Sequence, residues 1–487
     1  MKNKQARAPL YEALDQYANA GLVHFDVPGH KKRLHDGLGE FIGERTVQLD
    51  ANSTKELDML SNPTGIIREA EVLLADAYGA DYAYMLVNGS TFGVQAMIMA
   101  ACGPKDKIIL PRNVHKSAIN GIILSGAVPV FVEPEINREY GIANGISYEQ
   151  VKRAIHDNPD AKAVLLINPT YFGVVSDIRA IIKLCHRHQM MVLADEAHGA
   201  HFPFYPEFPD NASASGADLA TVSMHKTGGS LTQSSVLLLN ERIITHSQML
   251  TVINLMQTTS ASYLLMASLD LARRNLVMEG QARYDVIFRA VEEAKRKLIA
   301  TPGLQVLTRE DINGQGFYDY DETKIVVKVN DLGLTGFQVY DLMRQEFNIQ
   351  LELAETYVVL AVVGIGDDES TINRLVEALQ SIAGRYYGRQ NPFLLDQSSL
   401  FEKPMTVVSP REAFYSPKRL VPIDKAVGEI CAESIMIYPP GIPLAIPGEK
   451  MSQNIVDHYQ FYRQQNCVVM NNADDPDMIQ VLGEPTE

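Results

Sequence analysis

The sequence predicts an α/β protein built around a mostly parallel, seven-stranded sheet. Between residues 61 and 245, short apolar runs alternate with segments whose apolar residues recur at helical spacing. The runs are apolar at consecutive positions, so we expect helices to cover both faces of the sheet. They occupy residues 84–87, 108–110, 128–132, 164–167, 191–194, 219–222 and 236–239.

Changes in pattern along the chain predict five regions. Residues 1–60 form an N-terminal arm in which Pro28 and Gly29 interrupt any continuous helix, and residues 61–300 form the large α/β domain. Residues 301–385, with the β-branched run 325–329, form a smaller αβ domain. The polar stretch 386–400 is a linker, and the proline-rich residues 401–487 form a loop-rich C-terminal α+β domain.

Composition excludes several classes of protein. The 487 residues include 43 Lys and Arg against 59 Asp and Glu, and the net charge of −16 repels a nucleic-acid backbone. We find no secretory signal and no apolar stretch of about 18–20 residues, so we expect a cytoplasmic protein without a membrane span. The cysteines stand far apart, which predicts buried, reduced thiols and no metal site: Cys102, Cys185, Cys431 and Cys467.

An acid and an amine follow two of the predicted strands. Asp195 ends one apolar run, and Lys226 comes shortly after the next run along the chain. Ligands of open parallel sheets bind beyond the carboxyl ends of the strands, where we expect Asp195, His198 and Lys226. This set suits pyridoxal phosphate, because the amine forms a Schiff base and the acid pairs with the pyridinium nitrogen. For either residue alone, the alternative is a solvated lysine or a salt-bridged acid.

Two further strand ends predict partners for such a cofactor. Backbone N–H groups and hydroxyls at the start of a helix bind anions, and a Gly-Ser-Thr sequence stands at such a place. His115 follows another run and can stack on the cofactor ring. The alternatives are a simple helix N-cap and a structural histidine. The donors predicted for the phosphate are Gly89, Ser90, Thr91, Ser223 and His225.

An ordered set of motifs spans nearly the whole chain and resembles one known family. The motifs are Pro28-Gly29-His30-Lys31, Asn113-Val114-His115-Lys116-Ser117, Asn168-Pro169-Thr170-Tyr171, Asp195-Glu196-Ala197-His198-Gly199, Ser223-Met224-His225-Lys226, Thr258-Thr259-Ser260, Pro410-Arg411-Glu412-Ala413-Phe414-Tyr415, and Tyr438-Pro439-Pro440-Gly441-Ile442-Pro443 with Pro447-Gly448-Glu449. Together they resemble the Orn/Lys/Arg decarboxylase family in its short bacterial form. These are pyridoxal-phosphate enzymes of the aspartate-aminotransferase fold (fold type I), so the resemblance implies that fold.

The resemblance also implies a role for each matching residue. Lys226 forms the internal aldimine and Asp195 holds the pyridinium nitrogen. His115 stacks on the ring, and His198 reaches the phenolic oxygen of the cofactor. The residues that hold the phosphate are Ser90, Thr91, Ser223 and His225, joined by Thr258 or Thr259 from a partner subunit. The minimum unit is then a homodimer with shared sites.

The activity that the resemblance implies is pyridoxal-phosphate-dependent decarboxylation of a basic amino acid. We expect arginine first and lysine or ornithine next, with CO₂ and a polyamine or its precursor, such as agmatine, as products. Two alternatives stay open: transamination or oxidative deamination of a related cationic amino acid, and a catalytically silent homologue that regulates an active relative. The retained Lys226, Asp195 and His115 oppose the silent homologue.

The N-terminal segment departs from the family pattern. Asp26 stands where most members carry the first histidine of His-x-Pro-Gly-His, and Asp58-Met59-Leu60-Ser61 stands in place of Asp-Asp-Leu-His. If this segment lines the substrate pocket, specificity changes; if it only packs, the changes are neutral. The candidate substrate residues are Asp26, His30, Asp58 and Glu449. The three acids are candidate partners of a substrate's distal cation, although surface acids are more often merely solvated.

Overall fold

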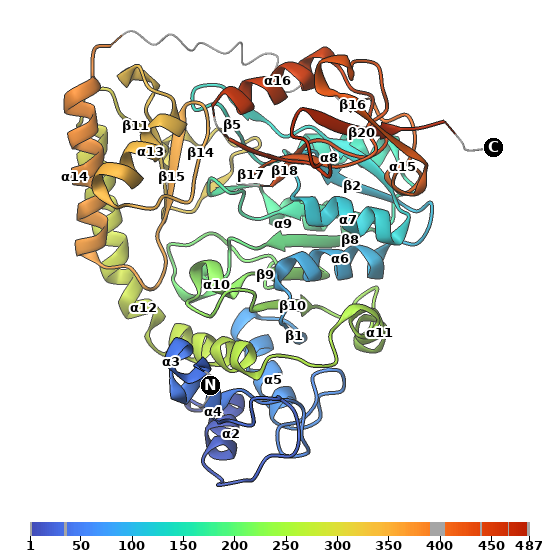
Figure 1. Ribbon diagram of the computed structural model, residues 1–487, viewed down its shortest axis with the longest axis vertical. Helices are drawn as coiled ribbons and strands as arrows, with labels where there is room; N and C mark the ends of the chain where they lie inside the picture. Colours follow the sequence, from blue (N-terminus) through green and yellow to red (C-terminus); the bar gives the residue numbers. More distant parts are fainter. Residues whose placement is uncertain (1, 34–36, 390–404, 439–440, 466, 485–487) are drawn as a thin grey trace. The chain divides into compact units, whose positions relative to one another are not determined.

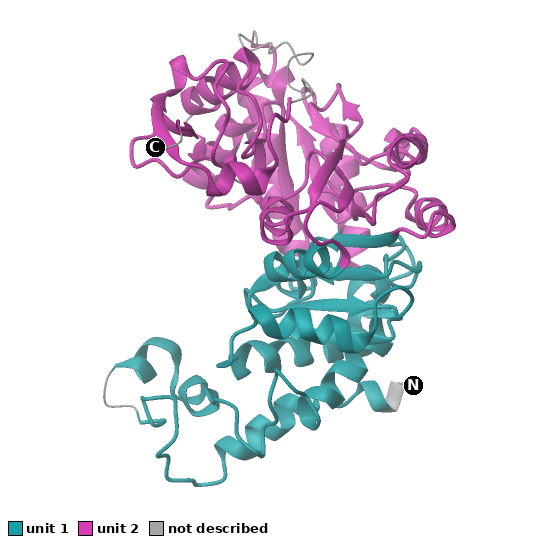
Figure 2. Ribbon diagram, turned by 90° about the vertical axis from the view of Figure 1, so that its right-hand side faces the viewer, with its two compact units in different colours: residues 1–100, 191–285, 364–366 teal, residues 101–190, 286–363, 367–487 magenta. Residues whose placement is uncertain are grey.

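The computed structural model describes residues 2–33, 37–389, 405–438, 441–465 and 467–484 (Figure 1). It divides into two compact units, each assembled from separate stretches of the chain (Figure 2). The first unit comprises residues 1–100, 191–285 and 364–366; the second comprises residues 101–190, 286–363 and 367–487. The two units are groups of residues that pack compactly together, and their limits do not test the predicted domain boundaries, which stay a prediction. Residues 390–400 of the predicted linker lie outside the described residues.

The N-terminal part of the first unit is built from short helices. Pro9 opens the second helix, because its fixed φ suits the first helical turn, and Leu10 and Leu14 bury that helix's apolar face. Gly79, at φ +68°, ends the fifth helix in the left-handed conformation that favours glycine. The helices are α1 (Lys2–Gln5), α2 (Pro9–Ala18), α3 (Leu38–Ile42), α4 (Glu44–Leu49) and α5 (Ile66–Tyr78).

Four strands of the first unit carry the candidate site. In spatial order they are β1 (Tyr82–Leu86), β10 (Ser235–Leu239), β9 (Leu219–Val222) and β8 (Met191–Glu196). Strands β8 and β9 are parallel, whereas β10 is antiparallel to β1 and β9. Every residue of β8, β9 and β10 is buried, which explains why these runs are apolar at consecutive positions. The helical elements here are α6 (Gly89–Ala101), η1 (Phe202–Phe204), α10 (Met224–Thr227) and α11 (His246–Met256).

Three parallel strands stand in the second unit: β6 (Ala163–Ile167), β2 (Lys107–Pro111) and β3 (Val128–Val132). The strand order β1-β10-β9-β8-β6-β2-β3 confirms the predicted seven-stranded, mostly parallel sheet. Ser147 begins one neighbouring helix with a capping box, in which its hydroxyl accepts the Gln150 N–H and the Gln150 side chain accepts the Ser147 N–H. The helices here are α7 (Lys116–Ser125), α8 (Tyr148–Asp157) and α9 (Ile178–Arg187).

A smaller antiparallel sheet follows the long helix α12 (Tyr263–Ile299). Its strand order is β11 (Gln305–Val306), β13 (Lys324–Lys328), β15 (Val358–Val362) and β14 (Leu353–Ala354), and β13 matches the predicted β-branched run. Helix α13 (Gly336–Phe347) packs against β15 and against α14 (Glu369–Tyr386). Shorter elements are β4 (Ile136–Asn137), β5 (Ile142–Ala143), β7 (Val174–Val175), β12 (Asp319–Tyr320), η2 (Arg309–Asp311) and η3 (Asn330–Leu332).

The C-terminal residues form a separate cluster of α and β elements with a core of their own. Cys431, Ile435, Tyr459 and Val481 are among its buried residues. Its elements are α15 (Pro410–Tyr415), β16 (Lys418–Pro422), η5 (Ile423–Lys425), β17 (Ile435–Tyr438), β18 (Ile442–Ala445), α16 (Gln453–Gln464), β19 (Val468–Met470) and β20 (Met478–Leu482). Across the described ranges, we find no helix that combines the length and apolarity needed to cross a bilayer.

A substitution at Gly93 can test how closely α6 packs on β9. A methyl group at this position lies 2.2 Å from Oγ1 of Thr221, a buried hydroxyl that donates to the Val236 carbonyl at 3.1 Å. We expect Gly93→Ala to lower the free energy of unfolding by about 1–3 kcal/mol, because overpacking a buried contact forces its neighbours to shift. The measurement is the urea midpoint of the purified protein.

Gly384→Ala is the matched control. Gly384 lies within α14, and a methyl group added there meets, among the described residues, no atom within 4 Å beyond its chain neighbours and the backbone of its own helix. Alanine in the middle of a helix costs less entropy than glycine, so we expect stability to rise by about 0.5–1 kcal/mol. An unchanged midpoint for Gly93→Ala would contradict the tight packing of α6.

Candidate active site

The parallel pair β8 and β9 positions the central residues of the site. Asp195 on β8 lies opposite Thr221 on β9, and Glu196 lies opposite Val222, so both strands end at the same edge. Ser223 and α10 follow β9, and the turn that carries His198 follows β8. The structure therefore brings together Asp195, His198 and Lys226 in the first unit.

Lys226 lies in α10 with its amine beside an imidazole. Its Nζ is 2.8 Å from Nε2 of His198, whose side chain is buried. Amine and imidazole nitrogens both bind protons, so a proton held at one nitrogen can pass to the other along this hydrogen bond. The turn after β8 and the first turn after β9 thus form one amine–imidazole pair.

Asp195 is a buried acid within the same set. The Ala197 N–H donates to its Oδ1 at 3.1 Å. Burial raises the pKa of the Asp195 carboxyl, and the Ala197 N–H and the positive charge of Lys226 partly oppose this change. The electrostatic attraction between a cation and a desolvated carboxylate is stronger than the same attraction in water. This position therefore favours a protonated ring nitrogen.

Small hydroxyl residues gather at the start of α6. Ser223 donates from Oγ to Oγ of Ser90 at 2.9 Å, and Oγ1 of Thr221 lies 3.4 Å from the same oxygen. Gly89 has φ +69°, which favours glycine at this turn, and Thr91 in the first turn of the helix is exposed. The arrangement has the donors that a phosphate group needs at a helix N-terminus.

His225 lies next to Lys226 and is oriented by the backbone. Its Nδ1 is 3.0 Å from the Ser234 carbonyl, and because a carbonyl only accepts, Nδ1 carries the proton. Burial lowers the pKa of the imidazole, an effect that the bond to Ser234 opposes. Binding an anion at Nε2 therefore requires protonation of this ring, which a phosphate charge favours.

The structure adds two residues that the sequence analysis missed. Thr221 supplies a hydroxyl next to Ser90, and the Gln233 carbonyl accepts the Gly89 N–H at 2.8 Å. Gln233 has φ +80°, an unusual conformation for a non-glycine residue. Neither residue stands in a recognisable motif, so only the pairing of β9 with β10 could reveal them.

His115 and the threonine pair stand on elements other than β8, β9, α6 and α10. His115 belongs to the second unit, where it caps α7 by accepting the Ser117 N–H at Nδ1, 3.2 Å away. Thr258 and Thr259 are exposed, and Thr258 lines a hollow of about 310 Å³ with Asn88 at the end of β1. The roles predicted for these three residues stay predictions.

The N-terminal acids have partners within the first unit. Asp26 is exposed and pairs with His24 at 2.9 Å, and His30 lies 3.0 Å from Asp50. Asp58 has φ +67°, and its carboxylate accepts the N–H groups of Thr64, Gly65 and Ile67 at 2.7–3.1 Å. Asp58 thus caps the N-terminus of α5, which gives it a local structural role.

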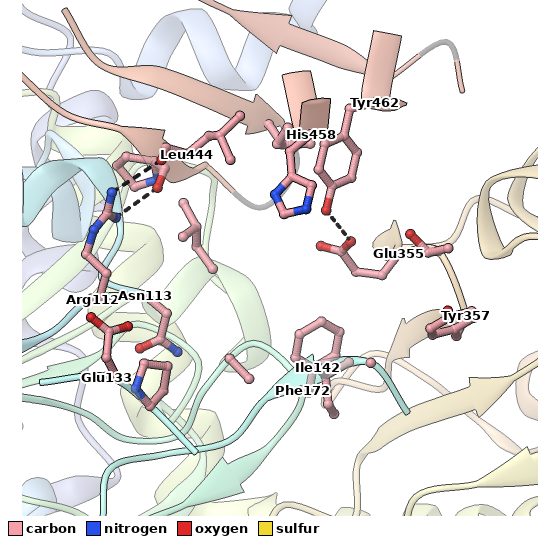
Figure 3. Close-up of a pocket in the computed structure, with 17 residues that line it drawn as sticks. Arg112, Asn113, Glu133, Ile142, Phe172, Glu355, Tyr357, Leu444, His458 and Tyr462 are labelled. Atoms are coloured by element: carbon pink, nitrogen blue, oxygen red, sulfur yellow. Dashed lines mark hydrogen bonds between the residues drawn. The ribbon is translucent and has the colours of Figure 1, made fainter. Parts of the chain in front are cut away.

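Glu449 is buried in an ion pair. Its Oε2 accepts from Arg112 at 2.9 Å, and the same guanidinium donates to the carbonyls of Pro443 and Leu444 at 2.9 and 3.4 Å (Figure 3). Burial raises the pKa of the Glu449 carboxyl, and Arg112 opposes the change. The pair ties the C-terminal strand β18 to the end of β2, and the predicted contact of Glu449 with a substrate stays a prediction.

Comparison with known proteins identifies the family. Residues 8–371 match the model of the Orn/Lys/Arg decarboxylase major domain, and residues 395–467 match that of its C-terminal domain. The chain belongs to the Orn/Lys/Arg decarboxylase family. This confirms the predicted family and the predicted class of enzyme.

Several relatives carry the name arginine decarboxylase. The Bacillus subtilis protein is 42% identical over 456 residues, which cover 93% of each chain. The Halalkalibacterium halodurans protein is 39% identical over 478 residues, which cover 97% of each chain. Among solved structures, the lysine decarboxylase of Francisella novicida matches with a TM-score of 0.83 at 21% identity, covering 99% of this chain and 82% of that one. This likeness confirms the predicted fold class.

The ion pair of Glu449 with Arg112 can be tested by removing the acid. We expect Glu449→Ala to lower the free energy of unfolding by about 3–5 kcal/mol, because it leaves a guanidinium buried without its counter-charge. Glu429→Ala is the matched control: it breaks an exposed pair with Arg419 and should cost about 0–1 kcal/mol. Thermal or urea unfolding measures both.

If Glu449 instead contacts the substrate, the Glu449→Ala variant keeps the wild-type midpoint and raises KM for the amino acid. That result would contradict the structural role of the buried pair.

Proposed function

We propose that this protein is a pyridoxal-phosphate-dependent decarboxylase of a basic amino acid. Arginine is the first substrate and lysine or ornithine the next, with CO₂ and an amine such as agmatine as products. The observation that carries the proposal is the group of Lys226, His198 and Asp195 at neighbouring parallel strand ends in a chain of this family. Relatives about 40% identical over nearly the whole chain, named arginine decarboxylase, support arginine.

The side chains present fit the cofactor. Lys226 offers an amine for the aldehyde, and the buried Asp195 offers a carboxylate for a protonated ring nitrogen. Ser90 and Ser223, within hydrogen-bond distance of each other at the start of α6, offer hydroxyls for the phosphate. Gly89, Thr91 and His225 complete that set, and His198 is assigned to the phenolic oxygen.

Each residue has a task in the reaction. Pyridoxal phosphate, when bound, supplies an electron-withdrawing ring that accepts the electron pair left by the departing CO₂. Asp195 holds the proton on the ring nitrogen; two opposite unit charges about 4 Å apart gain about 4 kcal/mol at an effective dielectric constant near 20. Lys226 would hold the cofactor through its amine and would leave that position open to the amine of the substrate.

The amine–imidazole pair then holds and donates the proton that the product gains. Because Nζ of Lys226 and Nε2 of His198 are 2.8 Å apart, a proton can rest on either nitrogen. In exchange for the lost carboxylate the α-carbon takes up one proton, and this pair is the donor that we assign. His115 stacks on the ring in this proposal, by resemblance to the family.

The assembly is proposed on the same basis. A homodimer shares its two sites, and Thr258 or Thr259, which are exposed on one protomer, reach the phosphate bound by the other. The organisation is an arm at residues 1–60, a large domain at 61–300, a small domain at 301–385, a linker at 386–400 and a C-terminal domain at 401–487. The location is the cytoplasm. Asp26 is the N-terminal acid assigned to the distal cation and His30 is a further candidate substrate residue, whereas Asp58 serves first as a helix cap.

Lys226 and the choice of reaction can be tested together. We expect the purified protein, saturated with pyridoxal phosphate, to release CO₂ from arginine in one-to-one ratio with agmatine, and more slowly from lysine or ornithine. Lys226→Ala should lower kcat by about 10³-fold or more and abolish the visible absorbance band that borohydride removes. Lys425→Ala, at an exposed lysine, is the control. Keto-acid formation without CO₂ would indicate transamination, and a colourless protein would favour a silent homologue; either result contradicts the proposal.

Asp195→Asn tests the buried acid separately. The amide oxygen of asparagine can keep the bond from Ala197, so the change removes the charge and little else. We expect kcat to fall by about 10²–10³-fold, because the ring nitrogen loses its preorganised counter-charge. The same change at the exposed Asp160 should leave kcat as in the wild type. A kcat for Asp195→Asn within twofold of wild type would remove this residue from the mechanism.

A further inference from the structure

A cavity of about 180 Å³ lies wholly within the second unit (Figure 3). Its walls come from the ends of β2 and β3, the turn between β14 and β15, strand β18 and helix α16. At about 30 Å³ for each water molecule, the space equals roughly six waters, which is enough for a short organic ligand. Most of the wall is apolar or aromatic, with a few polar groups directed inward.

An imidazole in this wall has an unsatisfied nitrogen. The His458 side chain is 4% exposed, and its Nε2 has no hydrogen-bond partner among the described residues. Burial lowers the pKa of this imidazole, so the ring is neutral near pH 7. A buried polar atom without a partner costs about 1–3 kcal/mol, and a ligand that bonds to it recovers that free energy.

The carboxyl group of Glu355 lines the same cavity. Tyr462 lies one helical turn after His458 in α16 and donates its hydroxyl to Oε2 of Glu355 at 3.5 Å (Figure 3). Glu355 stands in the tight turn after β14, where burial raises its pKa to about 7. A cation beside this carboxyl would favour its ionised form and would gain a charge-assisted hydrogen bond.

The charges in the wall favour a cation over an anion. The charge of Arg112 is balanced by Glu449, and its two terminal nitrogens donate to Glu449 and two carbonyls, while its Nε has no hydrogen-bond partner among the described residues. Two acids, Glu133 and Glu355, also line the cavity. Phe172 and Tyr357 add aromatic faces, which attract ammonium and guanidinium groups. A carboxylate on the ligand would meet two acids here, and the guanidinium in the described part of the wall already has Glu449 as its counter-charge.

We propose that this cavity binds a small aliphatic guanidinium or ammonium ion that lacks a carboxylate, with Glu355 and His458 as its hydrogen-bond acceptors. The chemistry of the cavity supports the site by itself. Only the link to the product rests on the proposed function, because decarboxylation of a basic amino acid yields an amine of this class. Binding there gives the enzyme a site that senses its own product.

The test uses probes that cannot react with an aldehyde cofactor, because they have no primary alkyl amine. Butylguanidine is the cation, butylurea is its neutral analogue, and 4-guanidinobutanoate adds a carboxylate. We expect titration calorimetry on the holoenzyme to show butylguanidine binding at least tenfold more tightly than either analogue. Equal binding of butylguanidine and butylurea would overturn the proposal, and tighter binding of 4-guanidinobutanoate would show that the site accepts the carboxylate-bearing substrate class instead.

Substitutions locate the binding. Glu355→Gln keeps the size of the side chain and should weaken butylguanidine binding at least tenfold, and His458→Phe should weaken it as well. Asp457→Asn removes the same charge from the exposed neighbour of His458 and is the matched control. Unfolding midpoints check that each variant is folded. Unchanged affinity in Glu355→Gln would refute the site, whereas absence of CO₂ release by an enzyme that still binds butylguanidine would refute only the proposed function.

Discussion

The parallel pairing of β8 with β9 is the constraint on which the candidate active site depends. With Asp195 opposite Thr221, the two strands end level with each other, and the acid, the imidazole and the amine emerge at one edge. The backbone hydrogen bonds of the buried strands fix this register, because a one-residue slip would turn every side chain to the other face of the sheet. The chemistry of Lys226 therefore rests on an element that the apolar core holds rigid.

Burial then decides what each group at this edge can do. Asp195 is desolvated and accepts one backbone N–H, so its carboxylate is poised for a cation. His198 is buried beside Lys226, and their 2.8 Å contact couples the two nitrogens. At the start of α6, the close packing of Gly93 on Thr221 holds the hydroxyl of Ser90 beside that of Ser223. The same core contacts thus fix the positions of these side chains and exclude the water that would weaken their electrostatic interactions.

In the second unit, buried acids connect parts of the chain that are distant in sequence. Glu449 binds Arg112 across 337 residues of sequence, and Tyr462 reaches Glu355 across 107. Both contacts attach C-terminal elements to earlier strands and turns. They also leave the described wall of the cavity with two acids, aromatic rings and an arginine whose charge Glu449 already balances, which favours a cationic ligand.

The sequence by itself determined the strands of the large sheet and the family. Apolar runs such as 191–194 and 219–222 are local patterns, and the acid and the lysine stand directly after them, so strand direction alone places Asp195 and Lys226 at one edge. The tertiary structure decided which acids are free to act. Asp58 turned out to cap α5, Glu449 to pair with Arg112, and Glu355 with His458 to line a cavity that no motif indicated. The physical reason is that desolvation and ion pairing depend on groups that long-range packing brings together. Hydrophobic periodicity and the ends of strands, in contrast, depend on residues that are neighbours in the sequence.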